Sequence, residues 1–368
     1  MMSQRIKTID FGRGISVILM ILVHTLWIHA KQEVQTQTAL GHFIHFVGRG
    51  TPVFLIAMGF SFMISGNQNL GSAIKRGIYI LGIGFLMNFL KFVIPLLFDF
   101  APQNFIEAYG WQNPVTTQQL IYLVLTGDIL QLAGSSLLII GLIRKYISQR
   151  LVLLLLAILI AFISRWFTPV DTDYFIVNYI QQLFFSNGFW VYFPVFPWLS
   201  FIVLGMFFGK LYVENNGDQK ILFVRMLIYG LFFISAGAWM LWYNHEYHFN
   251  DFFHLGPGGV IYLAGWNFTV LFFFYLLLLY TRDNPVYKFI FYCSKNVTSI
   301  YVIQWVIICW SMGIFGFQNS NSWETLLLMP FFVALTFFVQ YLIDIVKTKN
   351  VYTLTKTKGI LAVTKRRS

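Results

Sequence analysis

The chain has 368 residues, of which 58% are hydrophobic and only 11% are charged. Soluble domains carry about 25% charged residues, so this composition excludes a soluble globular domain. The formal net charge of +11 does not indicate nucleic-acid binding, because the basic residues lie in short loops between apolar runs and in the C-terminal segment, a pattern typical of membrane topology. The predicted fold class is an all-α, polytopic integral membrane helical bundle.

In chain order, the apolar runs predict about ten membrane-spanning helices, each near the length of about 20 residues that crosses a bilayer. Their approximate bounds are 11–30, 50–66, 76–97, 120–143, 151–168, 194–213, 222–243, 259–280, 297–316 and 324–346. The aromatic stretch 174–190 is too interrupted for a span and is interpreted as an interfacial or re-entrant segment. We expect one transmembrane domain, 1–346, followed by a basic cytoplasmic tail, 347–368, that contacts anionic lipid.

The distribution of charge along the chain predicts the orientation of these spans. All but four of the 25 lysines and arginines fall in the N-terminal segment, the even-numbered loops or the tail; the exceptions are Lys31, Arg49, Lys91 and Arg165. Because positive residues mark the cytoplasmic side, both termini are expected there. All seven histidines fall instead in the outer halves of spans or in outer loops, where imidazole groups suit proton transfer near neutral pH.

The first predicted span contains three ionisable residues, Asp10, Arg13 and His24, in the stretch DFGRGISVILMILVH. In a helix, Arg13 and His24 point in directions that differ by only about 20° and lie about 16 Å apart along the axis. Asp10 lies near the same stripe, where it can pair with Arg13. Singly, Arg13 can be a lipid anchor and His24 a buried histidine with satisfied hydrogen bonds. Because they share one face at opposite depths, we interpret them as functional.

Four segments of the chain resemble a known family. They are RIKTIDFGRGISVILMILVH at 5–24, GRGTPVFLIAMGFSF at 48–62, GDILQLAG at 127–134 and FPVFPWLSFIVLGMFFGKL at 193–211. The chain resembles the transmembrane acyltransferase superfamily, most closely bacterial heparan-α-glucosaminide N-acetyltransferase-like proteins, and is related to the acyltransferase-three family. The resemblance extends over about residues 5–310, and its first and fourth segments are the most specific.

This resemblance implies an integral membrane acyltransferase of the bacterial inner membrane. Such enzymes take an acyl group from acetyl-CoA or another acyl-CoA on the cytoplasmic side. They deliver it to a hydroxyl or amine of a saccharide or glycan on the outer side. Asp10 and Arg13 are then expected at the donor, because a guanidinium fork fits phosphate. No metal is expected, and the sequence leaves the oligomeric state open.

The resemblance also implies a central histidine, which we predict to be His24. It can act as a general base on the acceptor or can itself be acylated for a short time. The corresponding histidine of animal relatives follows the first helix, so His29, His42 and His45 are alternatives. Relatives often carry a further histidine in an IYLxH-like stretch, whereas the matching segment here, SIYVIQWVII, has Gln304.

Two candidates lie in the predicted fourth span, at about the same depth as His24. Asp128 can orient the imidazole and stabilise its cationic form, as in a catalytic triad. The alternative is that Asp128 caps a helix beginning later than predicted. Gln131, one turn further on, can donate a hydrogen bond to a substrate carbonyl or can serve helix packing.

Three further residues are candidates for acceptor binding. Arg49 can hold an anionic acceptor or stabilise an oxyanion, or it can be an interface anchor. His45 is expected to line the acceptor cleft or to be solvated. Trp198 can stack on a sugar ring, although the aromatic belt of a membrane protein also explains it. The alternative function is a secondary transporter or channel for a small solute, which also needs ionisable residues inside a helical bundle.

Overall fold

The computed structural model describes residues 6–66 and 69–364, with side chains as far as residue 348. Within these residues the regular structure is helical and no strand occurs, which confirms the predicted all-α class. The helices are α1 (Lys7–His29), α2 (Gln32–Gln37), α3 (Ala39–Gly48), α4 (Thr51–Ile64), α5 (Leu70–Asn88), the π-helix η1 (Phe89–Val93), α6 (Ile94–Leu97), α7 (Gln103–Glu107), α8 (Thr117–Leu125), α9 (Ile129–Tyr146), α10 (Arg150–Ile163), α11 (Phe175–Phe185), α12 (Val195–Glu214), α13 (Gln219–Tyr243), α14 (His245–Phe249), α15 (Pro257–Tyr280), α16 (Pro285–Lys295), α17 (Val297–Trp310), α18 (Met312–Phe315) and α19 (Ser322–Thr364).

Nine helical units in the described part of the chain are long and apolar enough to cross a membrane, so the protein is a multi-pass membrane protein. The predicted span 151–168 corresponds to α10, which has only 14 residues because polar residues follow Ile163. The second unit, Ala39–Ile64, starts earlier than predicted because α3 and α4 are nearly continuous. Helix α19 extends into the predicted tail, 347–368, and ends at Thr364. Residues 365–368 lie outside the described residues.

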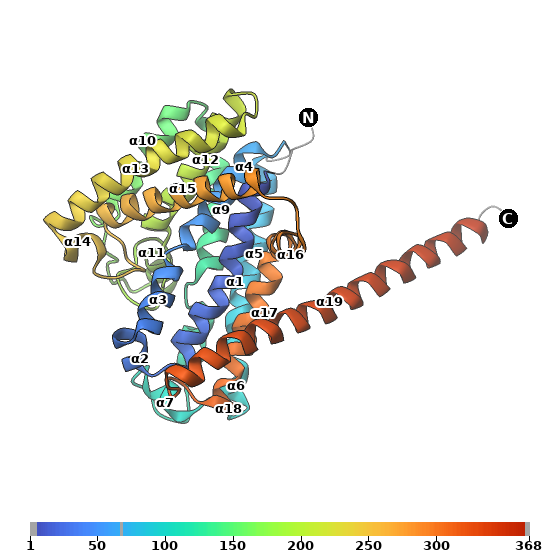
Figure 1. Cartoon of the computed structure of the whole chain (residues 1–368). Coiled ribbons are helices and arrows are strands. Elements are labelled where there is room, and N and C mark those ends of the chain that lie inside the picture. The colour runs from blue at the N-terminus through green and yellow to red at the C-terminus, as the bar shows by residue number, and fades with distance from the viewer. Residues whose placement is uncertain (1–5, 67–68, 365–368) are drawn as a thin grey trace.

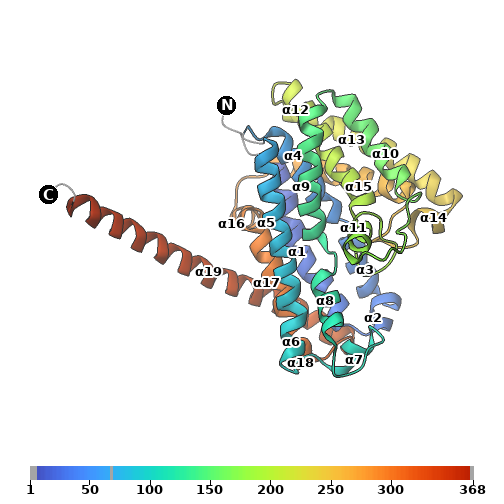
Figure 2. The ribbon, with the colours of Figure 1, turned by 180° about the vertical axis from the view of Figure 1, so that it is seen from behind.

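Helix α1 lies in the interior of the bundle, with 14 of its 23 residues buried (Figure 1). It contacts α3, α4, α15, α16, α17 and α19, which come from distant parts of the sequence. On the side of the bundle opposite α5 lie α10, α12, α13 and α15 (Figure 2). The end of α19 projects away from the bundle. The ionisable stripe of the first span is therefore packed among other helices: His24 is buried, and Asp10 and Arg13 are partly buried.

Two interruptions of helical geometry bring polar residues into the apolar interior. The long unit Leu70–Leu97 contains the π-helical turn η1, which carries Lys91. The predicted span 120–143 is broken between α8 and α9, and Asp128 becomes the N-cap of α9 in a capping box with Gln131. The late helix start considered for Asp128 is therefore confirmed. π-Helical turns inside α-helices are frequent at functional sites.

Helices α4 and α12 approach each other closely because glycines face the neighbouring backbone. A Cβ atom on Gly205 would lie 2.1 Å from the carbonyl oxygen of Ile56, and one on Gly59 would lie 1.8 Å from that of Ile202. Small residues at such positions let two membrane helices pack in direct backbone contact. This contact fixes α4, whose first turn borders the cavity described below.

We expect Gly205→Ala to separate α4 from α12, because the new methyl group has no room. Overpacking of this kind costs about 1–3 kcal/mol, so the unfolding temperature of the purified protein in detergent should fall by several degrees, on the order of 2–4 °C per kcal/mol. Gly82→Ala is the matched control, since no atom lies within 4 Å of a Cβ built there. Equal melting temperatures for the two variants would contradict this packing.

Candidate active site

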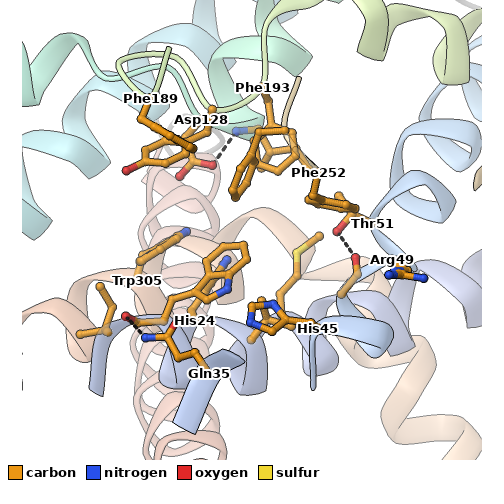
Figure 3. A pocket seen from close by; sticks show the side chains of 18 of the residues that line it. His24, Gln35, His45, Arg49, Thr51, Asp128, Phe189, Phe193, Phe252 and Trp305 are labelled. Atoms are coloured by element: carbon orange, nitrogen blue, oxygen red, sulfur yellow. Dashed lines mark hydrogen bonds between the residues drawn. The ribbon is translucent and has the colours of Figure 1, made fainter. Parts of the chain in front are cut away.

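A cavity of about 920 Å³ lies beside the C-terminal half of α1. This is a size typical of small-molecule sites. Its polar and charged lining includes His24, His45, Arg49, Lys91, Asp128 and Tyr301. Much of the remaining wall is aromatic, with Trp27, Tyr122, Phe193, Phe253 and Trp305 among its members. Figure 3 shows His24 and Trp305 at one side of the cavity, Arg49 and Thr51 at the other, and His45 between them.

His24 is held at the cavity wall by aromatic rings of α17. Its imidazole stacks on Trp305 with a centroid distance of 3.8 Å, and it meets the edge of Tyr301 at 5.8 Å. Nδ1 is enclosed and has no hydrogen-bond partner among the described residues. Nε2 keeps some accessible surface, and it makes no hydrogen bond to the described residues. Since His24 lines the cavity, this second nitrogen is the one available to a substrate.

A buried ion pair lies next to this histidine. Lys91 Nζ is 3.2 Å from Asp128 Oδ2, and the two side chains are only 3% and 7% exposed. Asp128 Oδ1 accepts hydrogen bonds from the Tyr301 hydroxyl at 3.0 Å and from the Ile129 backbone N–H at 2.7 Å. Lys91 Nζ also lies 4.1 Å from the centroid of the Trp305 ring. One network therefore connects η1, the start of α9 and α17 to the ring that supports His24.

The predicted triad-like hydrogen bond between Asp128 and His24 is absent from the described residues. Both residues line the same cavity, but the carboxylate oxygens of Asp128 bind Lys91, Tyr301 and Ile129 instead. Lys91 is a partner that sequence reasoning missed. Its only signal in the sequence was its place among the four basic residues outside the segments predicted to be cytoplasmic. Local spacing does not pair a lysine of α5–η1 with an aspartate 37 residues later.

Of the candidates for acceptor binding, His45 and Arg49 line the cavity. The Arg49 guanidinium lies 5.3 Å from the centroid of the Phe249 ring. Gln131 and Trp198 are not among the lining residues. The Gln131 side chain accepts from the Asp128 backbone N–H at 3.1 Å. Trp198 is fully buried and donates to the Phe253 carbonyl at 2.7 Å, so it supports a wall of the cavity from behind.

Two of the three alternatives to His24 lie outside its cavity: one is buried with hydrogen-bond partners and the other is exposed. His29 is buried, and its ring nitrogens lie within hydrogen-bond distance of the Gly316 carbonyl and the Ser311 hydroxyl. His42 is exposed and does not line the cavity. Among the alternatives to His24, only His45 therefore shares its cavity.

The phenol of Tyr192, near Tyr122 and Asp128, is held in its neutral form. Tyr192 precedes α12, lies outside the membrane-spanning segments and lines the cavity. Burial, together with the nearby Tyr122 and Asp128, raises the pKa of Tyr192 to about 12. At neutral pH it is therefore a hydrogen-bond donor and not a base.

A second cavity, of about 330 Å³, lies beside the N-terminal half of α1 and is lined by Asp10, Arg13 and Arg76. The predicted pair is confirmed: Arg13 Nη2 is 2.6 Å from Asp10 Oδ1. Ser294 of α16 joins it, accepting from Arg13 Nε at 3.0 Å and donating to Asp10 at 3.2 Å. The first turn of α17, with Thr298, completes this lining.

The two cavities approach each other along three helices. On α1 the boundary falls between Arg13 and Ser16, on α4 between Thr51 and Phe54, and at α9 between Ile129 and Leu130. Three residues of α-helix rise about 4.5 Å, so roughly one turn of side chains separates the two spaces.

Among the described residues, no group of three or more His, Cys, Asp or Glu side chains is placed to hold a metal ion. No curated protein matches the sequence. Residues 5–246 match the family described as heparan-alpha-glucosaminide N-acetyltransferase, catalytic. This segment includes α1, η1 and the start of α9, which carry His24, Lys91 and Asp128. Because it extends over well over half of the 368 residues, the chain belongs to the heparan-alpha-glucosaminide N-acetyltransferase catalytic family.

Proposed function

We propose that this protein transfers an acetyl or other acyl group from cytoplasmic acyl-CoA to an amine or hydroxyl of a saccharide on the outer side of a bacterial inner membrane. Family membership supports a membrane acyltransferase. The proposed donor, acceptor and direction of transfer rest on one observation: two cavities lie along α1, one lined by Arg13 and the other by His24. An enzyme that joins reactants from opposite sides of a membrane needs two such spaces on one path.

The smaller cavity has the character of a site for the phosphates of the donor. Two guanidinium groups, Arg13 and Arg76, line it, and Asp10 is the one carboxylate among its described lining residues. Asp10 and Ser294 hold the Arg13 side chain in a fixed orientation. A preorganised guanidinium binds phosphate with less loss of side-chain entropy than a free one. The N–H groups at the start of α17 add a partial positive charge beside Thr298.

The reacting end of the donor then lies near His24. Arg13 and His24 are about 16 Å apart along α1, which is of the order of the reach of an extended pantetheine arm. The arm has to cross the boundary between Arg13 and Ser16. Since only about one helical turn of side chains separates the cavities, side-chain rearrangement is enough to open this path.

His24 acts on the acceptor through Nε2. As a general base it takes a proton from the amine or hydroxyl while that group attacks the thioester carbonyl carbon. When the tetrahedral intermediate collapses, the C–S bond breaks and the imidazolium returns the proton to the thiolate. In the alternative order, Nε2 attacks the thioester carbonyl carbon, the C–S bond breaks and CoA leaves as the thiolate. The acceptor then attacks the acyl-imidazole, the C–N bond breaks, and the acceptor's proton passes to the CoA thiolate.

Lys91 supplies positive charge and free ammonium N–H donors where an oxyanion develops, while Tyr301 gives its single hydroxyl proton to Asp128 and so orients that carboxylate. Both line the cavity beside His24, and Asp128 holds them. In an enclosed site such donors stabilise a tetrahedral intermediate more strongly than in water. At the other side of the cavity, Arg49 and His45 contact the acceptor, and the aromatic wall suits the apolar face of a sugar ring.

His24→Ala should reduce acyl transfer by about 10²–10⁴-fold, because the general base or acyl carrier is lost. The measurement is radiolabelled acetyl transfer from acetyl-CoA to a panel of amino sugars and glycans by purified protein. His42→Ala is the control, since this histidine lies outside the cavity. Full activity of His24→Ala with loss in His45→Ala would make His45 the catalytic residue. If acetyl-CoA neither binds nor turns over while a solute crosses liposomes, the protein is a transporter.

Lys91→Met should destabilise the protein by about 3–5 kcal/mol, because Asp128 remains buried without its cation. Adding Asp128→Asn should restore most of the stability, since asparagine keeps the N-cap of α9 without a charge. Thermal unfolding in detergent measures both effects. Acyl transfer should stay low in the double variant, because the cation near the oxyanion is still absent. A single variant as stable as the wild type would contradict a buried charged pair.

Arg13→Met should raise the KM for acetyl-CoA by about tenfold with a smaller effect on kcat, because a charge-assisted phosphate contact is lost in ground and transition states alike. Initial rates over a range of acetyl-CoA concentrations give both constants. Lys75→Met is the matched control: it removes an exposed cation that is next to Arg76 in the sequence but does not line the smaller cavity. An unchanged KM in Arg13→Met would remove Arg13 from the donor site.

A further inference from the structure

One face of α17 packs against the imidazole of His24, whose Nδ1 is buried. Tyr301 and Trp305 both contact the imidazole, as described above. Gln304 is three residues after the first and next to the second, so these three side chains lie on the same face of the helix. Gln304 is fully buried and does not line the cavity. Its side chain lies within interaction range of the His24 side chain, so it meets the imidazole from a side that the cavity does not reach.

The buried amide of Gln304 and one ring nitrogen of His24 lack hydrogen-bond partners among the described residues. Neither Nε2 nor Oε1 of Gln304 makes a hydrogen bond to the described residues, and the same holds for Nδ1 of His24. Buried polar groups in folded proteins are paired in the large majority of cases, because an unpaired one costs about 1–3 kcal/mol. The carboxylate of Asp128 does not meet this need, since Lys91, Tyr301 and Ile129 occupy it.

We propose that Gln304 is the positioning residue of His24: its Oε1 accepts a hydrogen bond from His24 Nδ1–H and holds the lone pair of Nε2 toward the cavity. The inference rests on the proposed function, in which Nε2 is the reacting atom. An imidazole that donates from Nδ1 is the tautomer that can take a proton, or attack a carbonyl, at Nε2. Without this bond the ring can turn or change tautomer, and the lone pair is then misplaced.

The neutral amide is consistent with the charges around it. Lys91 from η1 and Asp128 from the start of α9 already form an ion pair that faces His24, and Tyr301 faces it from α17. A carboxylate at position 304 would add a second buried negative charge and would stabilise the imidazolium. An amide orients the ring without adding a charge, so the histidine stays neutral and able to accept a proton.

Three variants test this pairing. Gln304→Leu removes the acceptor, and we expect kcat to fall at least about tenfold with little change in the KM for acetyl-CoA. Gln304→Glu keeps the acceptor but adds a charge, so activity should persist with the acid limb of the pH–rate profile at higher pH. Gln340→Leu is the control: Gln340 is also fully buried with an unpaired amide oxygen, but lies on α19 away from the cavity. It should leave kcat and the pH profile unchanged.

A second measurement does not depend on turnover. Diethyl pyrocarbonate modifies neutral imidazole, and mass spectrometry of His24 over a pH series reports when the ring loses its proton. The midpoint should move up by at least about half a pH unit in Gln304→Glu. No shift in that variant, or unchanged kcat in Gln304→Leu, would overturn the role of Gln304. If the wild type transfers no acyl group, the proposed function fails, and the labelling series still decides whether the two residues are paired.

Discussion

The buried ion pair between Lys91 and Asp128 is the interaction on which the centre of this protein depends. Two charges in an apolar interior are stable only when they pair and their remaining polar atoms are satisfied. Both conditions require departures from regular helix: the π-turn η1 carries Lys91 and a helix start carries Asp128. Tyr301 then satisfies the remaining acceptor and ties α17 to the pair. Since α17 also provides the ring beneath His24, the ion pair fixes the place of the imidazole without touching it.

Helix α1 relates this centre to the opposite end of the bundle. Its residues are spaced by helical geometry alone, so Arg13 and His24 keep a fixed separation whatever the surrounding loops do. Each end has its own support: Asp10 and Ser294 hold Arg13, and the rings of α17 hold His24. In the proposed function, this rigid helix with two supported ends joins reactants that arrive from two sides, and the side-chain boundary between the cavities is the part that has to move.

The sequence predicted what helix periodicity and hydrophobicity determine. The all-α membrane bundle and the Asp10–Arg13 pair are confirmed, because both follow from local spacing. The partners of Asp128 could not be predicted, since they come from residues 37 and 173 positions away in the chain. Trp198 shows the same limit, because an aromatic residue near a helix start can face a cavity or support its wall. Only tertiary packing distinguishes these two positions.

Position 304 connects the resemblance with the packing. The resemblance leads us to expect a histidine in the segment that here reads SIYVIQWVII, and the family match ends at residue 246, before α17 begins. The family signature therefore does not determine what supports His24 from behind. In this protein a buried amide stands there beside an ion pair that is already complete. A second histidine could take up a proton and compete with His24 for it, whereas an amide cannot titrate. Glutamine at this position thus leaves His24 as the titratable imidazole at this wall of the cavity, where ring stacking on Trp305 places it and the proposed hydrogen bond from Nδ1 fixes its tautomer.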